Sequence, residues 1–229
     1  MLYSKEKEVI FMKKTLAILI FIMTLSIFTG CSARNNKPDD TIKDETIENQ
    51  TDPSLEKMPE DMKTMVEPAD SLLMCMLENN ITYDPADSTF FWKALYYFAG
   101  IYGPSHTLAE VDENGVLKLP RQTLREYAST LFADYDDLLA IPPALNSSIE
   151  YNSDWDAYIL HTGDRGLSQS EITVFADNGD GTYTITVALK GTVENDLIAK
   201  GRFKLVKNEY TDGITEPTYF YSIASAEII

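Results

Sequence analysis

The hydrophobic pattern of this chain changes its period near residue 147, and that change limits the folds available to it. Before this point apolar residues recur every three to four positions, which is typical of amphipathic helices. After it they alternate with polar residues, which is typical of half-buried strands. Helices and strands that are segregated along a chain favour an α+β fold. We therefore predict N-terminal helices packed on one face of a C-terminal, curved antiparallel sheet.

Three helices are predicted in the first half of the domain. They are expected over residues 62–77, 87–103 and 120–132. Pro68 is expected to interrupt or restart the first helix, because proline has no backbone N–H. Asp87 or Ser88 is the expected cap of the second helix, and Pro120 opens the third. Cys75 lies beside the apolar stripe of the first helix and is expected to be a small buried residue.

The clearest strand pattern lies on either side of the DNGDG segment at 177–181. Apolar and polar residues alternate over 172–176 and 183–189, and the glycine-rich segment between them predicts a hairpin turn. An EF-hand calcium loop is the less favoured interpretation, because Gly179 occupies a position where such a loop needs an oxygen ligand. Further strands are expected near 116–120, 149, 158, 197–206 and 218–228.

The N-terminal segment has the three zones of a secretory signal. Lys13 and Lys14 are followed by an uncharged apolar stretch from Leu16 to Phe28 and then by Gly30 and Cys31. An apolar run of about 15 residues rises about 22 Å as a helix, too little for a hydrocarbon core of about 30 Å. The sequence therefore predicts an exported protein, with translation starting at Met1 or Met12.

Phe28-Thr29-Gly30-Cys31 resembles the lipobox of bacterial lipoproteins, although leucine is usual where Phe28 stands. The resemblance implies lipidation of Cys31 and removal of residues 1–30. It also implies a cell-membrane protein with an extracytoplasmic domain, held by fatty acyl chains such as palmitate, because two acyl chains anchor stably. The alternative is an ordinary signal peptide with an incidental cysteine.

Charge and composition indicate the domain limits and argue against a nucleic-acid partner. The formal net charge is −17, and because residues 1–30 contribute +2, the remainder carries −19. A strongly anionic domain repels nucleic acid, so no nucleic-acid partner is expected. Residues 32–57 include 11 charged side chains and few apolar ones, which is typical of a flexible linker. The expected organisation is a signal peptide at 1–30, a lipidated linker at 31–57 and a single domain at 58–229.

Few residues have the pattern of a reactive or metal site. His161 lies near Asp164 in the segment HTGDRG at 161–166, but the sequence has no GxSxG, HExxH or paired CxxC motif. Three acidic residues follow the third helix and could form a calcium loop, although a solvated loop is the favoured interpretation: Asp134, Asp136 and Asp137. We predict no cofactor and no metal site.

Aromatic side chains provide the candidate ligand-binding residues. The second predicted helix is aromatic on more than one face, which favours a fully buried helix. The alternative is that Trp92 and Tyr96 line the mouth of a cone-shaped sheet and hold an apolar or sugar-like ligand, with Trp155 as a further candidate. The order of the predicted elements resembles that of nuclear-transport-factor-like and cystatin-like cone folds, which host many unrelated functions.

Two classes of function are compatible with these patterns. The favoured hypothesis is a non-catalytic binding or interaction module at the cell envelope, with an unidentified protein or small molecule as its partner. The alternative is a small envelope hydrolase that uses His161 or carboxylates.

Overall fold

The computed structural model describes residues 52–163, 165–211, 213 and 217–229. The signal segment, Cys31 and most of the expected linker therefore lie outside the described residues. The last five residues of that linker form a short 3-10 helix, η1 (Pro53–Lys57). The Ser54 hydroxyl accepts a hydrogen bond of 3.0 Å from the backbone N–H of Phe175. The folded domain thus begins a few residues before the expected boundary at residue 58.

Each of the three predicted helices is present. They are α2 (Val66–Asn79), α3 (Ser88–Tyr102) and α4 (Arg121–Leu131), with the short 3-10 helices η2 (Glu60–Met65), η3 (Gly103–Ser105) and η4 (Pro143–Leu145) between or beside them. The helix expected over 62–77 changes from η2 to α2 at Val66, which fits the expected restart near Pro68. Pro68 is the third residue of α2, where a backbone N–H has no partner inside the helix. Asp87 caps α3, and its carboxylate accepts hydrogen bonds from the backbone N–H groups of Thr89 and Phe90.

The strands form two four-stranded antiparallel sheets instead of the single sheet that we expected, and the α+β class is confirmed. The first sheet has the order β1-β2-β4-β3, with β1 (Glu110–Val111), β2 (Val116–Pro120), β3 (Ile149–Asn152) and β4 (Ala157–His161). The second has the order β5-β6-β7-β8, with β5 (Ser168–Asp177), β6 (Tyr183–Gly191), β7 (Leu197–Lys207) and β8 (Tyr221–Ile228).

The pairing of β2 with β4 explains the division into two sheets. Leu117 lies opposite Leu160, and Leu119 lies opposite Tyr158. All four side chains are buried, so the two strands share one apolar face. Alternating hydrophobicity shows which face of a strand is buried, but it does not specify the partner strand. The pattern of β4 therefore allows it to pair with β2, which precedes α4, instead of with the later strands.

The predicted hairpin at DNGDG is confirmed. It joins β5 to β6, and Asp177 lies opposite Tyr183 at its end. Gly179 and Gly181 have φ angles of 77° and 82°, a region that favours glycine. The Asp177 carboxylate accepts a hydrogen bond of 2.9 Å from the Gly179 N–H, so this carboxylate stabilises the turn.

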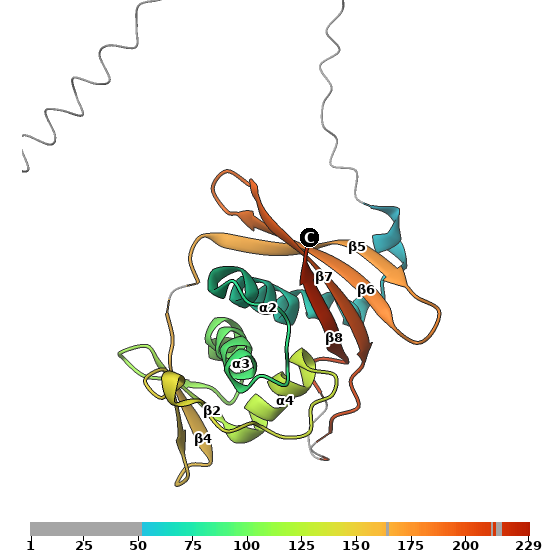
Figure 1. The fold of residues 1–229 in the computed structure, drawn as a ribbon. Coiled ribbons are helices and arrows are strands. Elements are labelled where there is room, and N and C mark those ends of the chain that lie inside the picture. The colour runs from blue at the N-terminus through green and yellow to red at the C-terminus, as the bar shows by residue number, and fades with distance from the viewer. Residues whose placement is uncertain (1–51, 164, 212, 214–216) are drawn as a thin grey trace, which may run out of the picture. The chain divides into compact units, whose positions relative to one another are not determined.

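The three helices lie between the two sheets (Figure 1). Helix α2 packs against all four strands of the second sheet, and α4 contacts β8 as well as β2 and β4 of the first sheet. The core between them is built from large side chains that include Trp92, Phe98 and Phe203. The helices therefore connect the two sheets through one continuous core.

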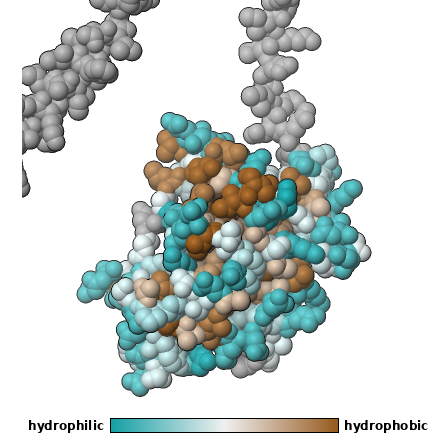
Figure 2. Space-filling model, viewed as in Figure 1, coloured by the Kyte–Doolittle hydropathy of each residue, from teal (hydrophilic) through white to brown (hydrophobic). Residues whose placement is uncertain are grey.

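Exposed aliphatic side chains gather at one end of the second sheet. They come from the start of β5, the β6–β7 turn, the start of β7 and the C-terminus: Leu167, Val193, Leu197, Ile198, Ile228 and Ile229. Backbone hydrogen bonds from Thr192 to Leu167 and from Ile229 to Lys200 bring these segments together. Figure 2 shows the resulting hydrophobic area over this end of the sheet.

Candidate functional site

The three aromatic residues proposed as ligand-binding residues do not come together. Trp92 is 1% exposed, and its Nε1 donates a hydrogen bond of 2.9 Å to the backbone carbonyl of Leu139. It is a core residue, so its proposed place at the mouth of a sheet is wrong and the buried-helix interpretation holds for it. Trp155 lies in the β3–β4 turn, 60% exposed, with Lys118 Nζ 4.5 Å from its ring centroid. Tyr96 lines a pocket.

The two histidines make unrelated contacts. The Nδ1 atom of His106 accepts a hydrogen bond from the backbone N–H of Leu108, so this ring shapes a turn. His161 is exposed at the end of β4, and its backbone carbonyl accepts a hydrogen bond from the Tyr96 hydroxyl. Asp164, the carboxylate expected near His161, lies outside the described residues.

The acidic segment after α4 is partly neutralised by arginine. Asp137 accepts a hydrogen bond of 2.7 Å from the Leu138 N–H and pairs with Arg125 at 2.9 Å and Arg121 at 3.8 Å. The Leu138 hydrogen bond and the two arginines lower the pKa of Asp137. Its carboxylate is therefore engaged by protein donors. Among the residues that the structure describes, no group of three or more histidine, cysteine or acidic side chains is placed to hold a metal ion.

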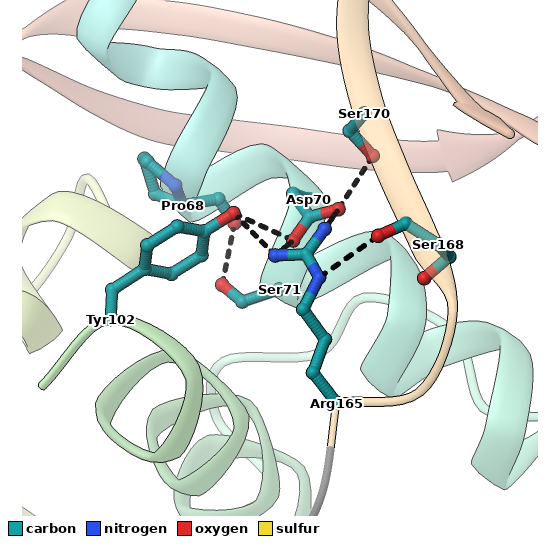
Figure 3. Close-up of polar contacts among 7 residues, drawn as sticks. All are labelled: Pro68, Asp70, Ser71, Tyr102, Arg165, Ser168 and Ser170. Carbon is teal, nitrogen blue, oxygen red and sulfur yellow. Dashed lines mark hydrogen bonds and ion pairs between the residues drawn. The ribbon is translucent and has the colours of Figure 1, made fainter. Parts of the chain in front are cut away.

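An ion pair between a buried aspartate and a half-buried arginine, which sequence reasoning missed, connects three parts of the fold (Figure 3). Asp70 of α2 is fully buried, and its two carboxylate oxygens lie 2.9 Å from the Nη1 and Nη2 atoms of Arg165. The hydroxyl of Tyr102, at the end of α3, donates to Asp70 at 2.8 Å and accepts from Arg165 at 2.9 Å. The Ser170 hydroxyl of β5 also donates to Asp70, and Arg165 Nε donates to the Ser168 carbonyl.

The electrostatics of this network favour a charged Arg165 and a protonated Tyr102. Burial acts to lower the pKa of Arg165, but its contacts with Tyr102 and Asp70 outweigh burial and raise the pKa. Burial and the neighbouring Asp70 carboxylate raise the pKa of Tyr102, so its hydroxyl keeps its proton and can donate. The network therefore holds α2, α3 and the segment between β4 and β5 in one arrangement.

A pocket of about 200 Å³ lies next to this network. We call it the Glu78 pocket. Its walls come from α2, α3 and the segment after β4, and it is lined by Met74, Glu78, Tyr96, Tyr97, Gly100, Ile101, Thr162, Gly163 and Arg165. Larger hollows of about 630, 670 and 250 Å³ lie between α4 and β7–β8, beside η1 and along the acidic segment after α4. The Glu78 pocket differs from them because Tyr96 and three residues of the 161–166 segment meet there.

Hydrogen bonds fix the polar groups that line the Glu78 pocket. The Tyr97 hydroxyl donates to Glu78 Oε2 at 2.6 Å and accepts from Asn79 Nδ2 at 3.2 Å. The Tyr96 hydroxyl donates to the His161 carbonyl. Burial raises the pKa of both tyrosines, and the hydrogen bond to Glu78 adds to the effect at Tyr97. Both phenols are therefore neutral donors to protein acceptors.

A glycine on α3 lets two walls of the pocket lie close together. A Cβ atom at Gly100 would lie 3.3 Å from the Thr162 Cγ2 atom, closer than ordinary van der Waals contact. The absence of a side chain thus lets the segment after β4 approach α3. Gly163, in the segment after β4, has open space around the position of a Cβ atom.

One signal in the sequence could have indicated the buried pair. Asp70 stands among the apolar residues of the first predicted helix, and a carboxylate on a buried face needs a cationic or hydrogen-bonding partner. The partner, Arg165, lies in the same HTGDRG segment that drew attention to His161. The sequence does not show that these two residues meet, because the contact depends on how α2 packs against β5.

Comparisons of the chain with models of protein families, with curated proteins and with solved structures found no match. Within the described residues, the structure contains no helix with the length and hydrophobicity needed to cross a membrane.

Proposed function

We propose that this protein is a lipid-anchored protein of the cell envelope whose extracytoplasmic domain is a non-catalytic binding module. The signal-like segment that begins at Met12 and the lipobox-like residues that end at Cys31 support the anchor. The acidic linker that follows supports a domain held away from an anionic membrane surface. The Glu78 pocket is the proposed ligand site of this domain.

The observation that carries the binding role is the fixed geometry of the pocket. Its tyrosine hydroxyls and its arginine are already held by hydrogen bonds within the protein. Groups held in this way lose little conformational freedom when a ligand arrives, which favours binding. The ion pair with the buried Asp70 holds Arg165 in place in this lining.

The hydrolase alternative has less support from the geometry. A hydrolytic site needs a nucleophile and a base within hydrogen-bonding reach of one another. No histidine is among the described residues that line the pocket. His161 is exposed and contributes its backbone carbonyl to Tyr96.

A nuclear magnetic resonance experiment on glycine amides tests the binding role. The full-length protein, purified in detergent and labelled with ¹⁵N-glycine, is titrated separately with propylammonium, propionate, propanol and glucose, each to about 20 mM, a range that detects weak binding. Gly100 and Gly163 report on the pocket, and Gly179 in the distant hairpin turn is the control. We expect at least one probe to shift Gly100 and Gly163 but not Gly179. If none of the four does so, the proposed binding role of this pocket is wrong.

A further inference from the structure

The Glu78 pocket contains a carboxylate that lacks a cationic partner among the described residues. Lys93, the basic residue of α3, donates to Asn79 Oδ1 instead. We propose that the pocket binds an alkylammonium group, such as the side chain of a lysine residue or a small free amine. This inference rests on the proposed function, because it names the ligand class of the same site.

The charge balance of the lining favours a cation. Arg165 is the cationic residue among the described lining residues, and the buried Asp70 carboxylate compensates its charge. Glu78, Arg165 and the adjoining Asp70 therefore have a combined formal charge of −1. A bound anion would meet this carboxylate without a free positive charge to offset it, whereas an ammonium group would neutralise it.

The hydrogen-bonding capacity of the lining also favours a donor ligand. The Tyr96 and Tyr97 hydroxyl protons are both committed to protein acceptors. A carboxylate can accept about four hydrogen bonds, and Glu78 accepts one, from Tyr97. Glu78 therefore has acceptor capacity left for a ligand, and an ammonium group offers three donors and no acceptor.

The apolar part of the lining fits the aliphatic stem of such a ligand. The rings of Tyr96 and Tyr97 stand in an edge arrangement, with centroids 6.3 Å apart. Aromatic rings attract cations through their faces. Met74 and Ile101 supply aliphatic surface in the same pocket, and its volume of about 200 Å³ suits one side chain more than a large ligand.

The test compares an amine with its neutral acetylated form on the ¹⁵N-glycine-labelled full-length protein. Nα-acetyl-lysine methylamide is titrated against Nα,Nε-diacetyl-lysine methylamide, and pentylammonium is titrated in parallel. We expect the lysine derivative to shift Gly100 and Gly163 with a Kd on the order of 1 mM, which is typical of so small a ligand. Tighter binding of the lysine derivative than of pentylammonium indicates a lysine residue as the source, and the reverse order indicates a free amine.

Three variants show which groups recognise the ammonium. Glu78→Gln removes the charge from an exposed side chain and should weaken binding about tenfold, because one charge-assisted contact is lost. Glu150→Gln makes the same change on the exposed face of β3 and should leave the Kd unchanged. Tyr97→Phe keeps the ring and frees Glu78 of its internal donor, so binding should persist within about twofold.

The results separate this inference from the proposed function. Equal binding of the diacetylated compound, or an unchanged Kd in Glu78→Gln, would overturn the ammonium assignment. Shifts of the pocket glycines with propionate or propanol, but with none of the amines, would also overturn the ammonium assignment. The proposed binding role would then stand. Absence of pocket shifts with every probe would overturn both.

Discussion

The carboxylate of Asp70 and the guanidinium of Arg165 form a bidentate pair across 95 residues of sequence, and the aspartate is completely buried. This contact connects the first helix of the domain to the segment that joins the two sheets. It also positions the one arginine among the described residues of the Glu78 pocket. The stability of the domain and the geometry of the pocket therefore depend on the same pair.

Replacing Arg165 with methionine should destabilise the domain strongly. Asp70 would remain buried with hydroxyl donors from Tyr102 and Ser170 but without a positive charge. Breaking a buried pair in this way costs about 3 kcal/mol of unfolding free energy, measured by urea titration. Arg202→Met is the matched control, because Arg202 and Glu227 form an exposed pair at 2.7 Å and should contribute less than about 1 kcal/mol. Similar losses in the two variants would contradict a special role for the buried pair.

Replacing Gly201 with alanine should destabilise the second sheet. A Cβ atom there would lie 2.7 Å from a ring carbon of Phe203 and 3.2 Å from a methyl carbon of Leu73. Overpacking of a buried site costs about 1–3 kcal/mol, so the urea midpoint should fall. Gly163→Ala adds the same methyl group in open space and should change the unfolding free energy by less than about 0.5 kcal/mol. An unchanged urea midpoint for Gly201→Ala would contradict this prediction, because it would mean that the Phe203 ring can move aside without cost.

Cys75 should be unreactive in the folded protein. Its side chain is buried, and burial raises the pKa of the thiol to about 12. The thiolate is the reactive form, so a thiol reagent should label Cys75 only after unfolding. If Cys31 carries lipid, the native protein should show no reactive thiol. If the thiol reagent labels the native wild type but not Cys31→Ser, the Cys31 thiol is free, and this would contradict the lipid anchor.

The domain should lose stability in alkaline solution. Burial raises the pKa of Tyr83, Tyr127 and Tyr219 above the ordinary value. Above pH about 10 the unfolded chain therefore loses tyrosine protons before the folded one, and the unfolding free energy falls by up to about 1.4 kcal/mol per pH unit for each group. Below that pH this stabilisation is complete. Tyr127→Phe should make the alkaline decline less steep, as followed by urea titration at each pH, and an identical slope would contradict the assignment.

The parts of the fold that follow from local pattern could be predicted, and those that follow from long-range pairing could not. The cap at Asp87 and the hairpin at Asp177 depend on neighbouring residues, and both are present. The pairing of Leu117 with Leu160 depends on which strand pairs most favourably with β4. Local pattern does not specify this, so the prediction of a single sheet is wrong. A strand of only two residues, Glu110–Val111, has too little pattern to detect.

The candidate site was predictable only in part. The aromatic density of α3 indicates Tyr96 as a candidate, and Tyr96 lines the pocket. The same pattern indicates Trp92, which is buried, because aromatic density does not show which side of a helix faces the core. Glu78 and Arg165 take their roles from contacts between distant segments. Lipidation of Cys31 and the resemblance to cone folds stay predictions.

The most direct test of the central claim is metabolic labelling with an alkyne-tagged palmitate. Cells producing the full-length wild type or Cys31→Ala are labelled, fractionated and probed for the protein. The anchor predicts labelled wild type in the membrane fraction and unlabelled Cys31→Ala. Label on Cys31→Ala, or unlabelled wild type that keeps residues 1–30 in the cytosol, would contradict the account.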